Sequence, residues 1–413
     1  MKSRGPVVAA VFWLTMLTAV GQAQVPERRE IGPDADLCAE INSLPPGGEL
    51  LLRGGEYRGP CTVHQGGLPG SPSVIRAKSP DARPRILYAD RTSNVFTLRA
   101  DHLTFRDLDL GPTQRNVDGF RLHSRAGITI EGCRFEGLRG IAVAATHVSL
   151  RGLTVRGNRI EGSEATGMYF GCHEGHSCEV TDLVVEGNHI QGVRAPDPEI
   201  GYGIQVKLNS VGMIRNNVIV DTKGPGIMVY GSRMPDRISV VERNVVMGSL
   251  RSSGIVVGGG PVIVRNNVVI GNQEAGIGLE DYGRRGLLRG VIVVHNTAYG
   301  NPGGGIAVPD RGLREAVVVN NAAHAPVGAE PLPLPSGTVR AAGNVNCAMT
   351  LCFENPQGYD FSPAPGSPLP QGGIAAVEAW MPTVDLFGAP RRGVPTAGAI
   401  EGPNGPLPLP IRP

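Results

Sequence analysis

Short runs of alternating apolar and polar residues recur along most of the chain, each introduced by a glycine. In the run Gly203-Ile-Gln-Val-Lys207, for example, the second and fourth residues are apolar, whereas the third and fifth are polar. A period of two predicts a short β-strand with one face on a core. Equivalent runs begin at Gly119, Gly140, Gly167, Gly203, Gly226, Gly254, Gly276 and Gly305. The pattern therefore predicts a long series of short strands.

A second repeat, built around an asparagine, alternates with the first. Its asparagines follow one another at steps of 23 to 30 residues. They are Asn158, Asn188, Asn217, Asn244, Asn267, Asn296, Asn321 and Asn344. Cys133 lies 25 residues before Asn158 and occupies the same register. Two interleaved repeats of about 26 residues indicate a solenoid in which each repeat forms one coil.

We therefore predict an all-β fold, a single-stranded parallel β-helix with an N-terminal cap and a loop-rich C-terminal closure. Right-handed coiling is expected because parallel crossover connections are right-handed. Stacked asparagines can hydrogen-bond along the axis, and asparagine also tolerates the left-handed bend of such a turn. The alternative is a β-sandwich, but its hairpins need tight turns rather than one long, fixed period.

The regions around the repeats predict the remaining organisation. Residues 1–23 place Lys2 and Arg4 before an apolar run and small residues, which is typical of a secretory signal peptide. The apolar run of about 14 residues is shorter than the roughly 20 needed to span a membrane. The remaining chain is divided into an N-terminal cap with the first coil (24–60), the β-helix (61–345), the closure (346–401) and a disordered tail (402–413). We expect a secreted or periplasmic protein.

Cysteine spacing agrees with export. Six of the seven cysteines form three local pairs, predicted to be disulfides: Cys38–Cys61, Cys172–Cys178 and Cys347–Cys352. Metal binding by the 172–178 segment is the alternative for the second pair. Cys133 is expected to be free and buried.

Charge and composition narrow the possible partners. The chain has 39 basic and 37 acidic residues, and 37 of each remain after residues 1–23 are removed. A neutral surface argues against general affinity for nucleic acid or anionic membranes. The 59 glycines argue against a helix-rich fold, because glycine destabilises helix interiors. We expect a monomer.

The two ends and the repeats together resemble secreted right-handed parallel β-helix proteins of the pectate-lyase-like superfamily. The resemblance covers residues 35–401 and rests on three features: the opening Pro46-Gly-Gly-Glu49, the Asn-Asn-Val-Ile coils, and the ending Gly398-Ala-Ile-Glu401. The superfamily includes lyases of pectate and alginate, polygalacturonases, uronan epimerases and non-catalytic members. The resemblance is specific for the fold and does not choose among these reactions.

The outward positions of the glycine-led strands supply candidate chemistry. Lys207 and Tyr230 are predicted to be exposed neighbours, because coils stack about 4.8 Å apart, and Glu280 lies roughly 14 Å further along. We predict β-elimination on a uronic-acid polysaccharide, with Lys207 as base and Tyr230 or His176 as acid. Arg233 or a bound Ca²⁺ would neutralise the substrate carboxylate. A Lys or Arg base, often with Ca²⁺, is what the resemblance implies.

Further substrate contacts are expected on the same face. They are Tyr169, His173, Gln205, Asn209, Glu280, Asp281 and Arg284. Candidate oxygen ligands for Ca²⁺ are Glu174, Glu280 and Asp281. No other cofactor is expected.

Each of these residues has an alternative interpretation as a solvated sheet or loop residue, and the whole face as a non-catalytic carbohydrate-binding surface. An epimerase shares the first proton abstraction with a lyase. A hydrolase needs a carboxylate pair about 5–9.5 Å apart, and the Asp-Asp, Gly-His-Gly and Arg-Ile-Lys elements of polygalacturonases are missing.

Overall fold

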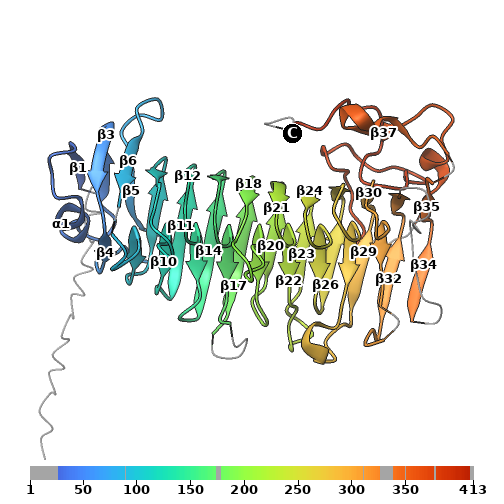
Figure 1. Ribbon diagram of the computed structural model, residues 1–413, viewed down its shortest axis with the longest axis horizontal. Helices are drawn as coiled ribbons and strands as arrows, with labels where there is room; N and C mark the ends of the chain where they lie inside the picture. The colour runs from blue at the N-terminus through green and yellow to red at the C-terminus, as the bar shows by residue number, and fades with distance from the viewer. Residues whose placement is uncertain are drawn as a thin grey trace, which may run out of the picture.

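The chain folds into an elongated, right-handed parallel β-solenoid of about 12 turns, as predicted (Figure 1). The computed structural model describes residues 27–88, 90–173, 178–309, 311–325, 338–348, 350–375 and 378–409. Strand counts below refer to these residues. The predicted signal peptide lies outside them. No helix in the described part of the chain is long and apolar enough to cross a membrane.

A complete coil contributes one strand to each of three parallel sheets, here called A, B and C, and the coils at the two ends are incomplete. Sheet A has 13 strands: β1 (Arg28–Ile31), β2 (Glu49–Leu52), β5 (Ser73–Ala77), β8 (Leu103–Arg106), β11 (Ala126–Glu131), β14 (Leu150–Arg156), β17 (Val180–Glu186), β20 (Gly212–Arg215), β23 (Ser239–Glu242), β26 (Val262–Arg265), β29 (Val291–Val294), β32 (Ala316–Val319) and β34 (Val339–Ala342).

Sheet B follows sheet A in each coil. Its 12 strands are β3 (Gly55–Arg58), β6 (Pro84–Leu87), β9 (Asp109–Leu110), β12 (Arg134–Glu136), β15 (Arg159–Glu161), β18 (His189–Val193), β21 (Val218–Thr222), β24 (Val245–Ser249), β27 (Val268–Ile270), β30 (Thr297–Tyr299), β33 (Ala322–His324) and β35 (Val345–Asn346).

Seven of the eight glycine-led runs of the sequence lead directly into strands of sheet C. The exception is the run at Gly140, where the strand begins three residues later, at Val143, which pairs with Phe120. The ten strands of sheet C are β4 (Cys61–Val63), β7 (Phe96–Leu98), β10 (Phe120–Leu122), β13 (Val143–Ala145), β16 (Met168–Phe170), β19 (Ile204–Val206), β22 (Ile227–Val229), β25 (Ile255–Val257), β28 (Ile277–Leu279) and β31 (Ile306–Ala307). Equivalent residues pair between coils, so that Ile204 lies beside Ile227 and Val206 beside Val229.

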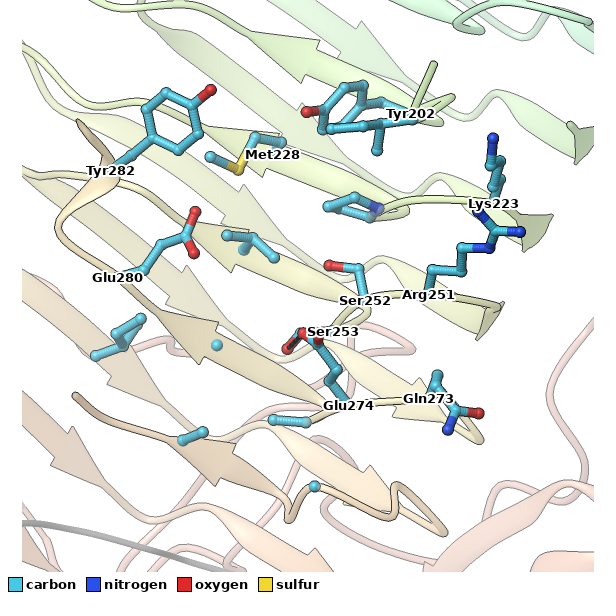
Figure 2. A pocket seen from close by; sticks show the side chains of 18 of the residues that line it. Tyr202, Lys223, Met228, Arg251, Ser252, Ser253, Gln273, Glu274, Glu280 and Tyr282 are labelled. Carbon is cyan, nitrogen blue, oxygen red and sulfur yellow. Dashed lines mark hydrogen bonds between the residues drawn. The ribbon is translucent and has the colours of Figure 1, made fainter. Parts of the chain in front are cut away.

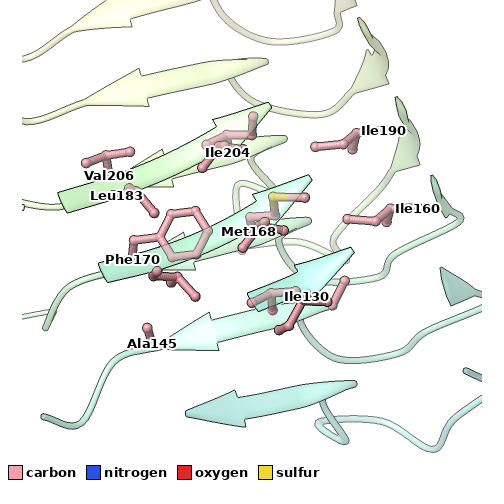
Figure 3. Close-up of a cluster of buried hydrophobic side chains, with 14 of the residues drawn as sticks. Ile130, Ala145, Ile160, Met168, Phe170, Leu183, Ile190, Ile204 and Val206 are labelled. Atoms are coloured by element: carbon pink, nitrogen blue, oxygen red, sulfur yellow. The ribbon is translucent and has the colours of Figure 1, made fainter. Parts of the chain in front are cut away.

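The core is a column of apolar side chains enclosed by the three sheets. Figure 3 shows a section of it, in which Ile130 of sheet A, Ile160 of sheet B and Met168 of sheet C point into the same interior. All three are fully buried. Because the coils are in register, each apolar side chain also stacks on its equivalent in the next coil, so the pattern of period two fills the interior without gaps.

The turn between sheets A and B carries the predicted asparagine ladder. The Nδ2 atom of each asparagine from Asn158 to Asn321 donates to the Oδ1 atom of the next, ending at Asn344, at 2.9–3.0 Å. Cys133 occupies the same register, because its N–H donates to Asn158 Oδ1 at 2.9 Å. The ladder satisfies buried polar groups of the turn in every coil.

The left-handed bend of this turn lies one residue earlier than expected. The ladder asparagines do not have positive φ; the residues before them do, as at Asn216 (φ 55°), Arg243 (54°) and His295 (53°). The expectation that the ladder asparagine itself takes the bend is therefore wrong. Its side chain is committed to the neighbouring coils, so the preceding residue makes the turn.

An N-terminal cap closes the first coil. Helix α1 (Leu37–Asn42) begins at Asp36, whose carboxylate accepts the N–H groups of Cys38 and Ala39 at 3.0 Å. The disulfide Cys38–Cys61 ties this helix to β4. Strand β1 precedes the helix, so the solenoid begins before its cap in sequence.

The C-terminal residues fold back over sheet B, on the upper side of Figure 1. They contain β36 (Phe353–Asn355), η2 (Pro356–Gly358), β37 (Asp360–Pro363) and η3 (Leu369–Gln371). Phe353 and Phe361 pack in one apolar cluster with Val245 and Val268 of sheet B. Leu407 joins this cluster and is 5% exposed, and its N–H donates to the Tyr359 carbonyl. The described part of the expected tail, up to residue 409, is therefore packed rather than free.

All three predicted disulfides are present, and Cys133 is free and buried. Burial raises the pKa of the Cys133 thiol to about 12, so this cysteine is inert. The Cys172–Cys178 bond excludes metal binding by these two thiols. Three disulfides fit an oxidising compartment.

Candidate active site on sheet C

The outer face of sheet C brings Lys207 and Tyr230 together, as expected. The two residues directly follow β19 and β22, whose last residues pair with each other. The Lys207 Nζ atom lies 4.0 Å from the ring centroid of Tyr230 and 5.6 Å from that of Tyr169. Within the described chain, the Lys207 ammonium makes these cation–π contacts and no hydrogen bond or ion pair.

These side chains are covered, which corrects the expectation of solvent exposure. Lys207 is 5% exposed, Gln205 3% and Tyr230 1%. Residues of a loop beside the sheet pack around Tyr230: Tyr282 lies edge-on against it at 4.6 Å between ring centroids, and Leu287 belongs to the same apolar cluster as Tyr230. Alternation along a strand predicts which side a residue faces, but not whether a loop lies above it.

Tyr230 is positioned as a support for Lys207. Its hydroxyl accepts from Gln205 Nε2 at 2.8 Å and interacts with the hydroxyl of Tyr202. Burial raises the pKa of Tyr230 far above its ordinary value. Tyr169, by contrast, is only half-buried, and burial raises its pKa to about 12. Its hydroxyl lies 3.4 Å from His173 Nδ1, and His173 is exposed.

Burial and a neighbouring cation lower the pKa of Lys207 to about 8, and the second cause is the charge of Arg285. The Arg285 guanidinium lies 5.2 Å from the ring centroid of Tyr282. Tyr282 contacts Tyr230, and the Lys207 ammonium lies over the Tyr230 ring. Two cations thus flank a pair of tyrosine rings. A lysine with a lowered pKa is partly neutral near pH 8 and is able to accept a proton.

The structure shows which nearby arginine acts electrostatically on Lys207, and the carboxylate-binding role of Arg233 stays a prediction. Arg285, rather than Arg233 or Arg284, reaches the electrostatic environment of Lys207. Arg233 is exposed, and its backbone N–H donates to Asn209 Oδ1 at 3.0 Å. Asn209 therefore helps to position the loop after β22. Arg284 is exposed and ends the short helix η1 (Tyr282–Arg284).

Asp281 has a structural role in the loop that carries Arg285. Its carboxylate accepts the N–H of Gly286 at 2.9 and 3.1 Å, and that of Leu287 at 3.4 Å. Among the described residues, no three His, Cys, Asp or Glu side chains form a group that could hold a metal ion. Glu174 and His176, predicted as a ligand and an acid, lie outside the described residues. Ca²⁺ binding stays a prediction.

A groove of about 580 Å³ adjoins this centre on its C-terminal side. Figure 2 shows Tyr282 and Tyr202 along one wall with Met228 between them, and Glu280, Ser253 and Glu274 below. Although Glu280 is exposed overall, partial desolvation of its carboxylate and the charge of Glu274 raise its pKa. Glu280 was predicted as a substrate contact; Glu274 was not.

Comparison with known proteins identifies the architecture. Residues 175–330 match the family profile described as "Right handed beta helix region". This chain is a right-handed parallel β-helix protein. No curated protein matches it.

Three solved structures share the fold of this β-helix protein. XylC, solved in complex with xylose, is 10% identical with a TM-score of 0.61 over 92% of this chain and 99% of its own. The GH136 lacto-N-biosidase from Eubacterium ramulus is 14% identical, with a TM-score of 0.53 over 78% of this chain and 68% of its own. The AlgE4 A-module, a mannuronan C-5 epimerase from Azotobacter vinelandii, is 14% identical, with a TM-score of 0.50 over 73% and 86%.

A cluster of one arginine and two histidines lies on the N-terminal part of the same sheet C face, and the sequence reasoning missed it. Arg121 donates to Thr146 Oγ1 at 2.9 Å, lies 3.1 Å from His147 Nε2, and forms an ion pair with buried Asp118. The His123 and His147 rings stack at 4.5 Å. Extending the alternation rule back to Gly119 would have found Arg121 and His123, which occupy its third and fifth positions.

The loop residues Tyr202, Tyr282 and Arg285 were missed for a different reason. They lie outside the glycine-led strands, so the alternation that located Lys207 says nothing about them. The one signal was the run of charged and aromatic residues at 280–285, which indicated a contact surface without showing which side chain faces Lys207.

Proposed function

We propose that this β-helix protein acts on an acidic polysaccharide lying along the outer face of sheet C, and cleaves it by β-elimination. The observation that carries the proposal is Lys207, a lysine with a pKa near 8 that two tyrosine rings hold just below the surface of this face, where it is 5% exposed. Carbohydrate is supported as the ligand class by the three solved structures of this fold: XylC in complex with xylose, a lacto-N-biosidase and a mannuronan C-5 epimerase.

The first step removes a proton from C5 of a uronate unit. Lys207, in its neutral form, takes the proton, and the electron pair left at C5 is delocalised into the adjacent carboxylate. Arg285 is the cation placed to stabilise the charge that develops there. The electron pair then forms a C4–C5 double bond as the bond from C4 to the glycosidic oxygen breaks.

Protonation of the leaving oxygen completes the reaction. Tyr169 is better placed for it than Tyr230, because Tyr169 is half-buried and contacts exposed His173, whereas Tyr230 is enclosed by its partners. With a pKa of about 12, Tyr169 keeps its proton until it is needed. His173 then returns a proton from solvent. No step depends on a metal ion.

Hydrolysis is the second candidate, because the groove contains a pair of carboxylates. Glu280 has a raised pKa, as a general acid requires, and Glu274, whose charge contributes to that shift, would be the partner carboxylate. An epimerase would share the first step at Lys207, and a binding protein would need no catalytic group.

The test is incubation of the purified protein with pectate, alginate, chondroitin and related uronans. Ultraviolet absorbance reports the unsaturated uronate that only elimination forms, and a reducing-sugar assay reports any cleavage. We expect absorbance to rise with the wild-type protein and Glu280→Gln, and to fail with Lys207→Ala. Lys78→Ala is the matched control, since Lys78 lies on the first coils and pairs with Glu30.

Three results would contradict the proposal. Reducing ends without absorbance, lost in Glu280→Gln, would establish hydrolysis. Retention of glycans without product would establish a binding protein. Full activity in Lys207→Ala would remove Lys207 from the reaction.

A further inference from the structure

The groove beside Lys207 is lined by carboxylates, whereas the Lys207 centre itself is cationic. Besides Glu274 and Glu280, the exposed residue Glu199 also lines the groove. Two cations line its far end, Lys223 and Arg251. Figure 2 shows both on the Tyr202 side, away from Glu280.

Both of these cations already form ion pairs with Asp197. Asp197 lies 2.7 Å from Lys223 Nζ and 2.7 Å from Arg251 Nη1. Lys223 Nζ also donates to the carbonyls of Ala195 at 2.9 Å and Glu199 at 2.5 Å. They therefore hold the loop before β19 in place. Among the described residues, the carboxylates of Glu199, Glu274 and Glu280 form no ion pair, so the groove is acidic.

The remaining lining suits a sugar without an acidic group. Ser252, Ser253 and Gln273 offer hydroxyl and amide groups, and Tyr202 and Tyr282 offer ring faces for the C–H side of a pyranose. Carboxylates accept hydrogen bonds from sugar hydroxyls or an acetamido N–H but repel a second carboxylate or a sulfate.

The groove and the Lys207 centre are adjacent. Met228 lines the groove and pairs in the sheet with Gln205, two residues before Lys207. Tyr282 lines the groove and contacts Tyr230, on which Lys207 rests. Neighbouring units of one glycan chain therefore meet two environments, one cationic and one acidic.

We infer that the substrate is a heteropolysaccharide in which the uronate bound at Lys207 and Arg285 is followed by a neutral or N-acetylated sugar bound in the groove. This inference rests on the proposed function, because it takes the Lys207 centre as the uronate site. A homopolymer of uronate would place a carboxylate beside Glu274 and Glu280.

The test measures binding, so that it does not depend on turnover. Two probes of equal length are compared by calorimetry: an oligogalacturonate, and a hyaluronan-type oligosaccharide in which uronate alternates with N-acetylglucosamine. We expect the alternating oligosaccharide to bind the wild-type protein at least tenfold more tightly. In the double variant Glu274→Gln/Glu280→Gln the ratio should fall below threefold, through tighter binding of the oligogalacturonate, most clearly at low salt. Glu354→Gln, at an exposed residue of strand β36 in the closure, is the matched control.

The outcomes separate the two claims. Equal binding of both probes by the wild-type protein, or a ratio unchanged in the double variant, would overturn the inference. Selective binding that the double variant abolishes would support it. Selective binding of the alternating oligosaccharide, without formation of unsaturated uronate, would support the inference about the substrate and overturn the proposed β-elimination.

Discussion

The turn between sheets A and B and the outer face of sheet C belong to the same coils but follow opposite rules. At the turn, every coil from Asn158 to Asn344 makes the same contact with the next. On sheet C, equivalent positions carry Arg121, Tyr169 or Gln205 in different coils. The repeated contact stabilises the solenoid, and the variable face is free to carry chemistry. Substitutions in the two regions should therefore affect different properties.

The largest effect is expected on sheet C, in catalysis. Lys207→Ala should lower kcat/KM on a cleaved uronan by about 10²–10⁴-fold, because it removes the proposed base. The melting temperature should stay close to that of the wild type, since the ammonium makes no hydrogen bond within the described chain. Activity and thermal melting are measured on the same preparations. A variant that is inactive only because it has unfolded would contradict the separation of the two regions.

The next largest effect is expected at the turn, in stability. Asn244 is fully buried, and its side chain makes four hydrogen bonds, two through Oδ1 to Asn217 and two through Nδ2 to Asn267 and Ile214. Asn244→Ala leaves these partners unsatisfied, so the free energy of unfolding should fall by about 3 kcal/mol. Urea denaturation measures the change, with exposed Asn346→Ala as the control. Equal losses in both variants would show that the ladder adds no special stability.

The same contrast explains which features the sequence could predict. The asparagine ladder, the stacked strands of sheet C and the pairing of Lys207 with Tyr230 depend on one period, and a period is visible in a single sequence. The burial of Tyr230, on which Lys207 rests, involves Tyr282 and Leu287, which lie in a loop outside that period. The role of Arg285 depends on how that loop folds around the Asp281 carboxylate. Neither could be predicted, because loop conformation is set by tertiary contacts rather than by the repeat.

A pH-dependent change in the free energy of unfolding, of intermediate size, is expected from the residue before Asn296 in the turn. His295 is fully buried, its Nδ1 lies 3.1 Å from the Thr396 carbonyl, and its Nε2 accepts from Asn320. Burial lowers its pKa to about 3. Between pH 3 and 6.5 the unfolded chain binds a proton that the folded chain does not, so stability falls as pH falls through this window. At pH 5 the loss should be about 2 kcal/mol relative to pH 7.

Substitution by asparagine tests this loss, because equivalent turn positions already carry Asn216, Asn266 and Asn320 with positive φ. Urea denaturation at pH 7 and pH 5 is compared for wild type and His295→Asn. The difference between the two pH values should be smaller in the variant by that amount. An identical difference in both proteins would assign the acid sensitivity to other groups.

The smallest effect is expected on sheet C. It changes the pH at which kcat/KM rises rather than the maximum value of kcat/KM. The kcat/KM of the wild type should rise with pH through an apparent pKa near 8, because only neutral Lys207 accepts a proton. Arg285 lowers that pKa by its positive charge, so Arg285→Gln should move the profile to higher pH. Arg233→Gln, on the exposed loop after β22, should leave it in place. A shift of the profile in Arg233→Gln, with none in Arg285→Gln, would show that Arg233 rather than Arg285 lowers the pKa of Lys207.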